Sequence, residues 1–189
     1  MKKLILIAAT ALLSLAASAQ DIKIGYVNFS ELVQLMPEAD EARARYQALQ
    51  KDASETYDTM IAEYQTKAQA YQQKSATWTA AIKESKENEL QRMVQSIQEY
   101  EQSVGAELQQ QQTELMAPIY QKAQDMVKTL AKEKGLTVLF DSSSALYFDQ
   151  GSAIDLTPVA RERLGIPADR TLEALQAELA AQAQAQQQQ

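Results

Sequence analysis

The feature that most constrains the fold is a long run, residues 37–134, in which apolar side chains recur at helical spacing. After Pro37 this run contains one glycine, Gly105, and one further proline, Pro118. In its first half the apolar spacing is four, three and four, which repeats every 11 residues and is close to the period of a straight helix. The first stripe consists of Ala42, Tyr46, Leu49, Ala53, Tyr57, Met60, Tyr64, Ala68 and Tyr71. The second consists of Leu90, Met93, Ile97, Tyr100, Val104, Leu108, Leu115, Ile119, Met126 and Leu130. The run therefore predicts long helices with an apolar stripe.

Strand patterns at both ends of this run predict that it folds back on itself. Residues 22–28 and 136–141 are rich in β-branched and aromatic residues. If these two strands pair, the run between them forms an antiparallel hairpin whose turn lies midway, near Ile82, in the polar segment 75–88. Each arm is then about 50 residues long, or roughly 75 Å at a rise of 1.5 Å per residue.

The predicted fold class is α+β, with a small β body of about three strands and a short helix from which a long helical hairpin arm projects. A third strand is expected at residues 145–148, which are apolar and lie between turn-forming clusters. The segment after Pro167 is rich in Ala and Gln and is compatible with a partial helix, but it has no convincing core face, so it is expected to be mobile. The expected divisions are a signal peptide (1–19), the β body (20–36 and 135–165), the arm (37–134) and a tail (166–189).

Helix ends are marked by capping residues. Ser30 is placed to cap a short apolar helix, and Pro37 suits the first turn of the long one. Gly135 is placed to end the second long helix. Thr157 is expected to cap a short helix that Gly165 ends.

The N-terminus has the pattern of a secretory signal peptide. Lys2 and Lys3 precede an apolar run over residues 4–15, and the small residues 17–19 follow as a cleavage site, so the mature protein is expected to begin at Gln20. The alternative, a membrane-spanning helix, is disfavoured because the run is shorter than the roughly 20 apolar residues that spanning requires. The exported protein is expected to be soluble.

Composition excludes several classes of function. The protein has no His and no Cys, which disfavours enzymatic chemistry, a disulfide, a lipid anchor on Cys and a metal site, and no cofactor motif is present. Removal of Lys2 and Lys3 from 18 basic residues leaves 16 against 25 acidic ones, a net charge of −9. Nucleic acid and anionic lipid are therefore disfavoured as partners.

Three stretches, in this order around a long helical insert, resemble the Skp/OmpH family of periplasmic chaperones. The first is residues 24–28 with Met36-Pro37 soon after, the second is residues 117–120 followed by 133–141, and the third is residues 155–165. The resemblance covers nearly all of residues 21–165. It implies a homotrimer assembled through the β body, with arms around a cavity that holds unfolded outer-membrane β-barrel proteins in the periplasm.

In the light of this resemblance, the main hypothesis is an ATP-independent holdase with no enzymatic activity. The alternative is a structural coiled-coil adaptor of the cell envelope, and an enzyme ranks third. One departure from basic-armed relatives is that residues 40–114 contain 8 basic and 13 acidic residues. Binding of lipopolysaccharide is left open for this reason, and so is the role of the Gln-rich end.

Tyrosine and methionine are enriched in the arms and are candidates for client contact, because both accept varied apolar partners. The alternative for those on the stripe is that they only fill the seam between the arms. The off-stripe residues Ile61, Val94, Met116 and Trp78 are therefore the better candidates, and Trp78 is expected to be largely exposed near the tip. The predicted client-binding residues are Met60, Ile61, Tyr64, Tyr71, Trp78, Met93, Val94 and Met116.

Three further predictions concern subunit assembly, a hinge in the arm and the aspartates of the body. Trimerisation is assigned to Ile22, Ile24, Val27, Val138 and Phe140. Pro118 is expected to bend the arm as a hinge, or to be a kink without a role. Asp141, Asp149 and Asp155 are assigned to turns and caps, with no metal.

Overall fold

The computed structural model describes residues 22–187, so the predicted signal peptide lies outside the described residues. The protein divides into two compact units. We call them the sheet unit, which contains the residues up to Leu32 and Gln124–Ala168, and the helical unit, which contains Val33–Ala123 and the residues from Asp169. Most residues are helical and the sheet is small, which confirms the α+β class.

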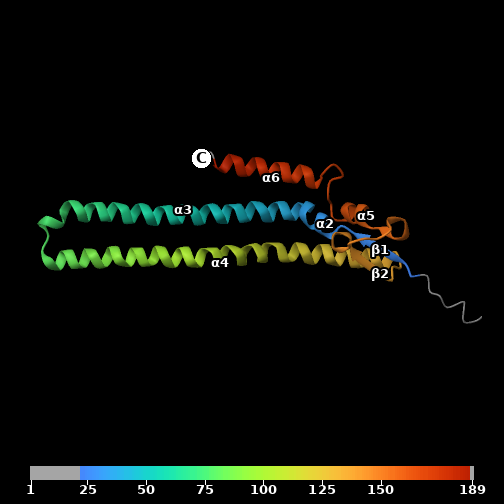
Figure 1. Cartoon of the computed structure of the whole chain (residues 1–189), viewed down its shortest axis with the longest axis horizontal. Helices are drawn as coiled ribbons and strands as arrows, with labels where there is room; N and C mark the ends of the chain where they lie inside the picture. Colours follow the sequence, from blue (N-terminus) through green and yellow to red (C-terminus); the bar gives the residue numbers. More distant parts are fainter. Residues whose placement is uncertain (1–21, 188–189) are drawn as a thin grey trace, which may run out of the picture. The chain divides into compact units, whose positions relative to one another are not determined.

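The sheet has three strands in the order β2-β1-β3, and both pairs are parallel. β1 (Ile24–Val27) pairs with β2 (Val138–Asp141) and with β3 (Ile154–Asp155). Parallel neighbours need a long crossover connection, and the helices between β1 and β2 supply it (Figure 1). The helical insert is therefore also what allows these two strands to pair.

The strand predicted at residues 145–148 is absent, and the third strand is β3 instead. Residues 142–153 contain two short 3₁₀ turns, η3 (Ser142–Ser144) and η4 (Gln150–Ser152). Leu146 and Tyr147 are exposed and pair with no strand, whereas Phe148 packs on Tyr26 with ring centroids 4.8 Å apart. This apolar run therefore packs one aromatic ring, that of Phe148, against the sheet without forming a strand of its own.

Carboxylates hold the turns of the sheet unit, as predicted. Asp141 and Asp149 each accept a backbone N–H two residues later at 3.0 Å, and Asp155 accepts the N–H of Thr157 at 2.8 Å. These bonds order turns that have no regular ladder.

The expected caps of the two short helices are corrected by their hydrogen bonds. α2 (Phe29–Leu35) already includes Ser30, and Asn28 caps it by accepting the N–H of Glu31 at 3.1 Å. α5 (Thr157–Arg163) begins at Thr157, whose buried hydroxyl accepts the N–H of Asn28 at 3.0 Å instead of capping. Thr157 therefore joins α5 to the end of β1.

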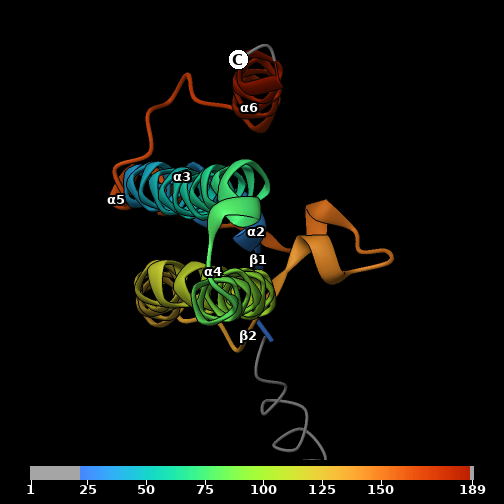
Figure 2. The same ribbon diagram turned by 90° about the vertical axis from the view of Figure 1, so that its left-hand side faces the viewer.

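The helical unit is built on two long helices that run antiparallel side by side (Figure 1, Figure 2). α3 (Pro37–Lys74) starts with Pro37 in its first turn, as predicted. A short 3₁₀ turn, η2 (Ser75–Thr77), connects it to α4 (Ala80–Glu133). The helices have 38 and 54 residues, so they are unequal and Ile82 lies within α4 rather than at the turn.

The end of α4 belongs to the sheet unit and closes as the sequence predicts. Gly135 has φ of 63°, a left-handed value that suits glycine, and the N–H of Leu136 donates to the carbonyl of Ala131 at 2.9 Å. Val127 and Leu130 on this last part of α4 are buried, and so are Leu156 and Ala160. The core of the sheet unit is therefore formed mainly by helical side chains, together with Leu156 and Val27.

The segment expected to be a mobile tail contains a helix, α6 (Leu172–Gln187), which lies on the side of α3 away from α4 (Figure 1, Figure 2). Arg170 pairs with Asp40 at 2.5 Å, and Gln47 donates to Gln182 at 3.2 Å. Leu175 is buried. The few leucines among the alanines and glutamines of this segment gave too weak an apolar pattern to predict this packing.

Candidate functional site

The surface shared by α3 and α4 is the candidate site, and several polar bonds connect the two helices across it. The hydroxyl of Tyr57 donates to Glu101 at 2.7 Å, and that of Tyr100 donates to the carbonyl of Ala53 at 3.0 Å. Tyr71 bonds Glu87 in the same way. Stripe tyrosines thus fasten the two helices through their hydroxyls, a role that their spacing did not reveal.

The apolar stripe is only partly covered by this pairing. Ala42, Ile97 and Ile119 are buried, with exposed fractions of 6%, 8% and 4%. Met60, Tyr64 and Met93 are half-buried. A pair of helices has one mutual seam, so a stripe that is wider than the seam keeps apolar surface accessible.

A pocket of about 310 Å³ opens midway along the pair. It is lined by Met60, Glu63, Glu89, Arg92, Met93, Ser96 and Ile97. We call it the methionine pocket. Two of the predicted client-binding residues, Met60 and Met93, meet here from opposite helices.

Charged groups surround the methionine pocket. Lys67 bridges Glu63 at 3.0 Å and Glu89 at 2.5 Å, and Lys86 pairs with Glu89 at 2.7 Å. The bonds from Lys67 and then Lys86 lower the pKa of Glu89 to about 2. Bonding to Glu89 and Glu63 raises the pKa of Lys67. Lys67 and Glu89 therefore remain charged at neutral pH.

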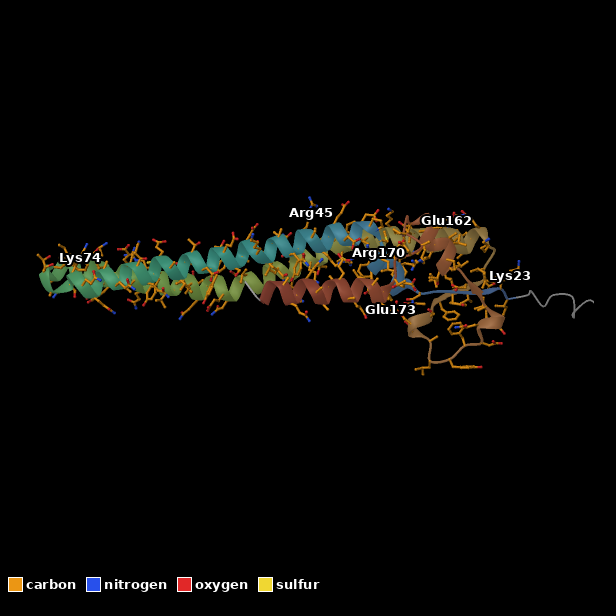
Figure 3. All side chains as sticks on the ribbon, turned by 90° about the horizontal axis from the view of Figure 1, so that it is seen from above. Lys23, Arg45, Lys74, Glu162, Arg170 and Glu173 are labelled. Atoms are coloured by element: carbon orange, nitrogen blue, oxygen red, sulfur yellow. The ribbon has the colours of Figure 1, made fainter. Side chains whose placement is uncertain are left out.

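The off-stripe candidates do not join this pocket. Ile61 and Met116 are half-buried, and Val94 is exposed. They add separate apolar points along the helices, where side chains project along the whole length of the pair as far as Lys74 (Figure 3).

Trp78, at the turn between the helices, is half-buried, which corrects the expectation of a largely exposed indole. Its ring packs edge-on against Tyr71, with centroids 5.7 Å apart and planes at 67°. The small neighbours of Trp78 in sequence misled the prediction, because the cover comes from the preceding helix.

A second pocket, of about 230 Å³, lies near the start of α3. Its floor includes Ala42, Leu115 and Ile119, and Glu38 pairs there with Lys122. The bond from Lys122 lowers the pKa of Glu38. Pro118 also lines this pocket. The helix α4 continues without a break on both sides of this proline.

The sheet unit has one apolar face that its helices leave open. Ile22, Ile24 and Val138 are 66%, 36% and 46% exposed. Half-buried Phe140 packs against Phe148 with centroids 5.0 Å apart. We call this the outer sheet face, and it contains four of the five predicted trimerisation residues.

Val27 is a correction to that prediction. It is only 3% exposed and alternates along β1 with Tyr26, so it lies on the opposite, buried face. Such a residue has no surface to offer to another subunit and belongs to the core.

Within residues 22–187, no group of three or more His, Cys, Asp or Glu side chains is placed to hold a metal ion. None of the helices formed by these residues combines the length and apolarity needed to cross a membrane.

The fold and the site define a class of protein in which a small parallel sheet is combined with long paired helices that have a partly open apolar stripe. Residues 23–164 match the family of outer membrane proteins described as OmpH-like, and the protein belongs to this family. It is also 29% identical over 151 residues to chaperone protein Skp of Yersinia enterocolitica, a match that covers 79% of this protein and 92% of that one. The family resemblance predicted from the sequence is thereby confirmed. α6 lies beyond the matched residues.

Proposed function

We propose that this protein is an ATP-independent holdase chaperone that shields unfolded outer-membrane β-barrel proteins. Membership of the OmpH-like family and similarity to a protein named chaperone Skp support this function. The observation that carries it is the apolar stripe of α3 and α4, which their mutual seam leaves half open.

Client contacts are spread along the helical pair and are individually weak. The proposed contacts are Met60, Ile61, Tyr64, Tyr71, Trp78, Met93, Val94 and Met116. If each buries roughly 50 Å² of apolar client surface, eight contacts contribute on the order of 10 kcal/mol at about 25 cal/mol per Å². Loss of client freedom offsets much of this, so the client is held reversibly.

We assign subunit assembly to the outer sheet face and propose a homotrimer whose arms surround a cavity. Exposed apolar side chains at Ile22, Ile24 and Val138 support this assignment, because a contiguous apolar patch on a small sheet is usually covered. A sheet unit of this size also has little core of its own, and oligomerisation is a common remedy.

The proposed location is the periplasm, reached by export with a cleaved signal peptide. The pattern of Lys2, Lys3 and residues 4–19 supports export, and family membership supports the compartment. Mass spectrometry of the protein from its native host tests this, with Gln20 as the expected first residue.

The decisive experiment is suppression of aggregation when a urea-unfolded outer-membrane barrel is diluted into buffer. Wild type is expected to keep the barrel soluble, and Met60→Ala with Met93→Ala to do so less well. Lys51→Gln, a change at a side chain that is 75% exposed, is the control. A wild-type protein that fails to suppress aggregation favours the envelope adaptor instead.

Light scattering tests the trimer separately. The double variant Ile24→Asp with Val138→Asp is expected to form particles of smaller mass than a trimer. Ile82→Asp, at an exposed residue of α4, is expected to remain a trimer. A monomeric or dimeric wild type contradicts the cavity.

A further inference from the structure

The methionine pocket has a different balance of charge from the rest of the arm. Residues 40–114 carry 8 basic and 13 acidic residues, a net charge of −5. Glu63, Glu89 and Arg92 line the pocket, and Lys67 and Lys86 pair with the two carboxylates from outside its lining. Together these five groups supply two negative and three positive charges, so the cluster around the pocket is positive by one charge on an acidic arm.

Arg92 is the source of this excess. Both pocket carboxylates are already bonded to lysines, at distances of 2.5–3.0 Å. Arg92 is exposed, and among the residues that the structure describes its side chain has neither a hydrogen bond nor an ion pair. Its guanidinium is thus available to an anion from outside, and its planar fork suits a carboxylate.

The floor beside Arg92 is apolar and adaptable. Met60 and Met93 face the pocket from α3 and α4, and Ile97 is 8% exposed beneath them. Methionine side chains adjust to aromatic and aliphatic partners alike. At about 310 Å³, the pocket is at the small end of the roughly 300–1,000 Å³ range of ligand sites. It fits a side chain or two rather than a folded element.

We propose that the methionine pocket receives a large apolar side chain of an unfolded client whose near neighbour is a carboxylate, and that Arg92 binds this carboxylate. The proposal rests on the proposed holdase function and adds a local sequence preference to it. A carboxylate from Asp, from Glu or from the C-terminus of a client has the required chemistry. A lysine at the same position meets Arg92 and is disfavoured.

The test uses the full-length mature protein and labelled, C-terminally amidated Gly/Ser decapeptides that contain one Phe followed by Asp, Asn or Lys. Fluorescence anisotropy at low salt is expected to show that the Asp peptide binds about 1.4- to 5-fold more tightly than the Asn peptide, since exposed ion pairs contribute about 0.2–1 kcal/mol. A fourth peptide, with Phe at a free C-terminus, distinguishes a terminal carboxylate from that of a side chain. The Lys peptide is expected to bind least well.

Variants separate the two parts of the pocket. Arg92→Gln is expected to remove the preference for Asp over Asn, so that the two peptides bind equally. Met60→Ala is expected to weaken all the peptides, and Met60→Leu to restore them. Lys51→Gln, which removes the same charge from a paired side chain on α3, is expected to keep the preference.

The outcome is distinguishable from that of the holdase test. Equal affinity for Asp and Asn peptides, or a preference that survives Arg92→Gln, overturns the pocket assignment even if wild type suppresses aggregation. Loss of the preference in Lys51→Gln as well shows a general charge effect and also overturns it. If aggregation is not suppressed, the proposed function fails, whatever the peptides do.

Discussion

Gly25 is a position where one added methyl group is expected to destabilise the folded protein. It lies buried in the central strand β1, opposite Leu139 and Ile154. A Cβ at this position would lie 2.4 Å from Cδ1 of Leu136 and 3.2 Å from the carbonyl oxygen of Ile154. Carbon atoms normally pack about 3.5–4.0 Å apart, so the first overlap exceeds about 1 Å.

The loss of stability depends on which of the two neighbouring groups is able to move away from the added methyl. The side chain of Leu136 has some freedom to rotate, but the carbonyl of Ile154 belongs to the strand that pairs with β1. Overpacking of this kind typically destabilises by about 1–3 kcal/mol, and we expect Gly25→Ala to fall in this range.

Urea unfolding followed by circular dichroism measures this effect, at one protein concentration because assembly shifts apparent stability. Gly105→Ala is the matched control. Gly105 lies within α4 with no atom within 4 Å of the added methyl, so the same change is expected to stabilise by about 1 kcal/mol. A Gly25→Ala protein as stable as wild type refutes the packing around β1 described above.

Three further predictions concern the long helices. Trp78→Ala removes an edge-to-face ring pair with Tyr71, worth about 0.5–1.5 kcal/mol. Amide exchange near the turn is expected to accelerate while the global unfolding midpoint stays unchanged, and a large drop in that midpoint contradicts a local role. Glu89 has a pKa lowered from 4.5 to about 2, so its bond with Lys67 stabilises the folded protein above pH 4.5 and is lost as the pH falls toward 2. Amide exchange, corrected for its intrinsic pH dependence, is expected to show this loss in wild type and not in Glu89→Gln; identical profiles contradict it. Pro118→Ala restores a backbone donor within α4 and is expected to slow exchange in that part of the helix, whereas unchanged exchange indicates that the proline is no hinge.

The sequence predicted helix ends correctly where the residue itself fits the backbone conformation required at that position. Pro37 in the first turn of α3 and Gly135 after α4 each satisfy a requirement of the backbone at that position. Ser30 and Thr157 failed as caps because other groups, Asn28 and Asp155, reach the free N–H groups instead. A capping residue competes with its neighbours, and pattern alone does not rank them.

The candidate site was predictable only in part. The apolar stripe identified Met60 and Met93, but not that they meet in one pocket with Arg92 at its rim. That meeting depends on the register between two antiparallel helices, which is set by bonds such as Lys67 to Glu89. Helical periodicity places residues on a face but contains no information on which residues face each other across a seam.

The sequence by itself determined the long helices, the pairing of the strands at their ends, and the family. Each follows from periodicity or from ordered motifs, which are local properties. Only the tertiary structure decided that β1 lies between two parallel neighbours, that β3 rather than residues 145–148 completes the sheet, and that Val27 is buried. It also decided that α6 packs beside α3. These depend on contacts between residues more than 100 positions apart in the sequence, whose energy is gained only when the whole protein is assembled.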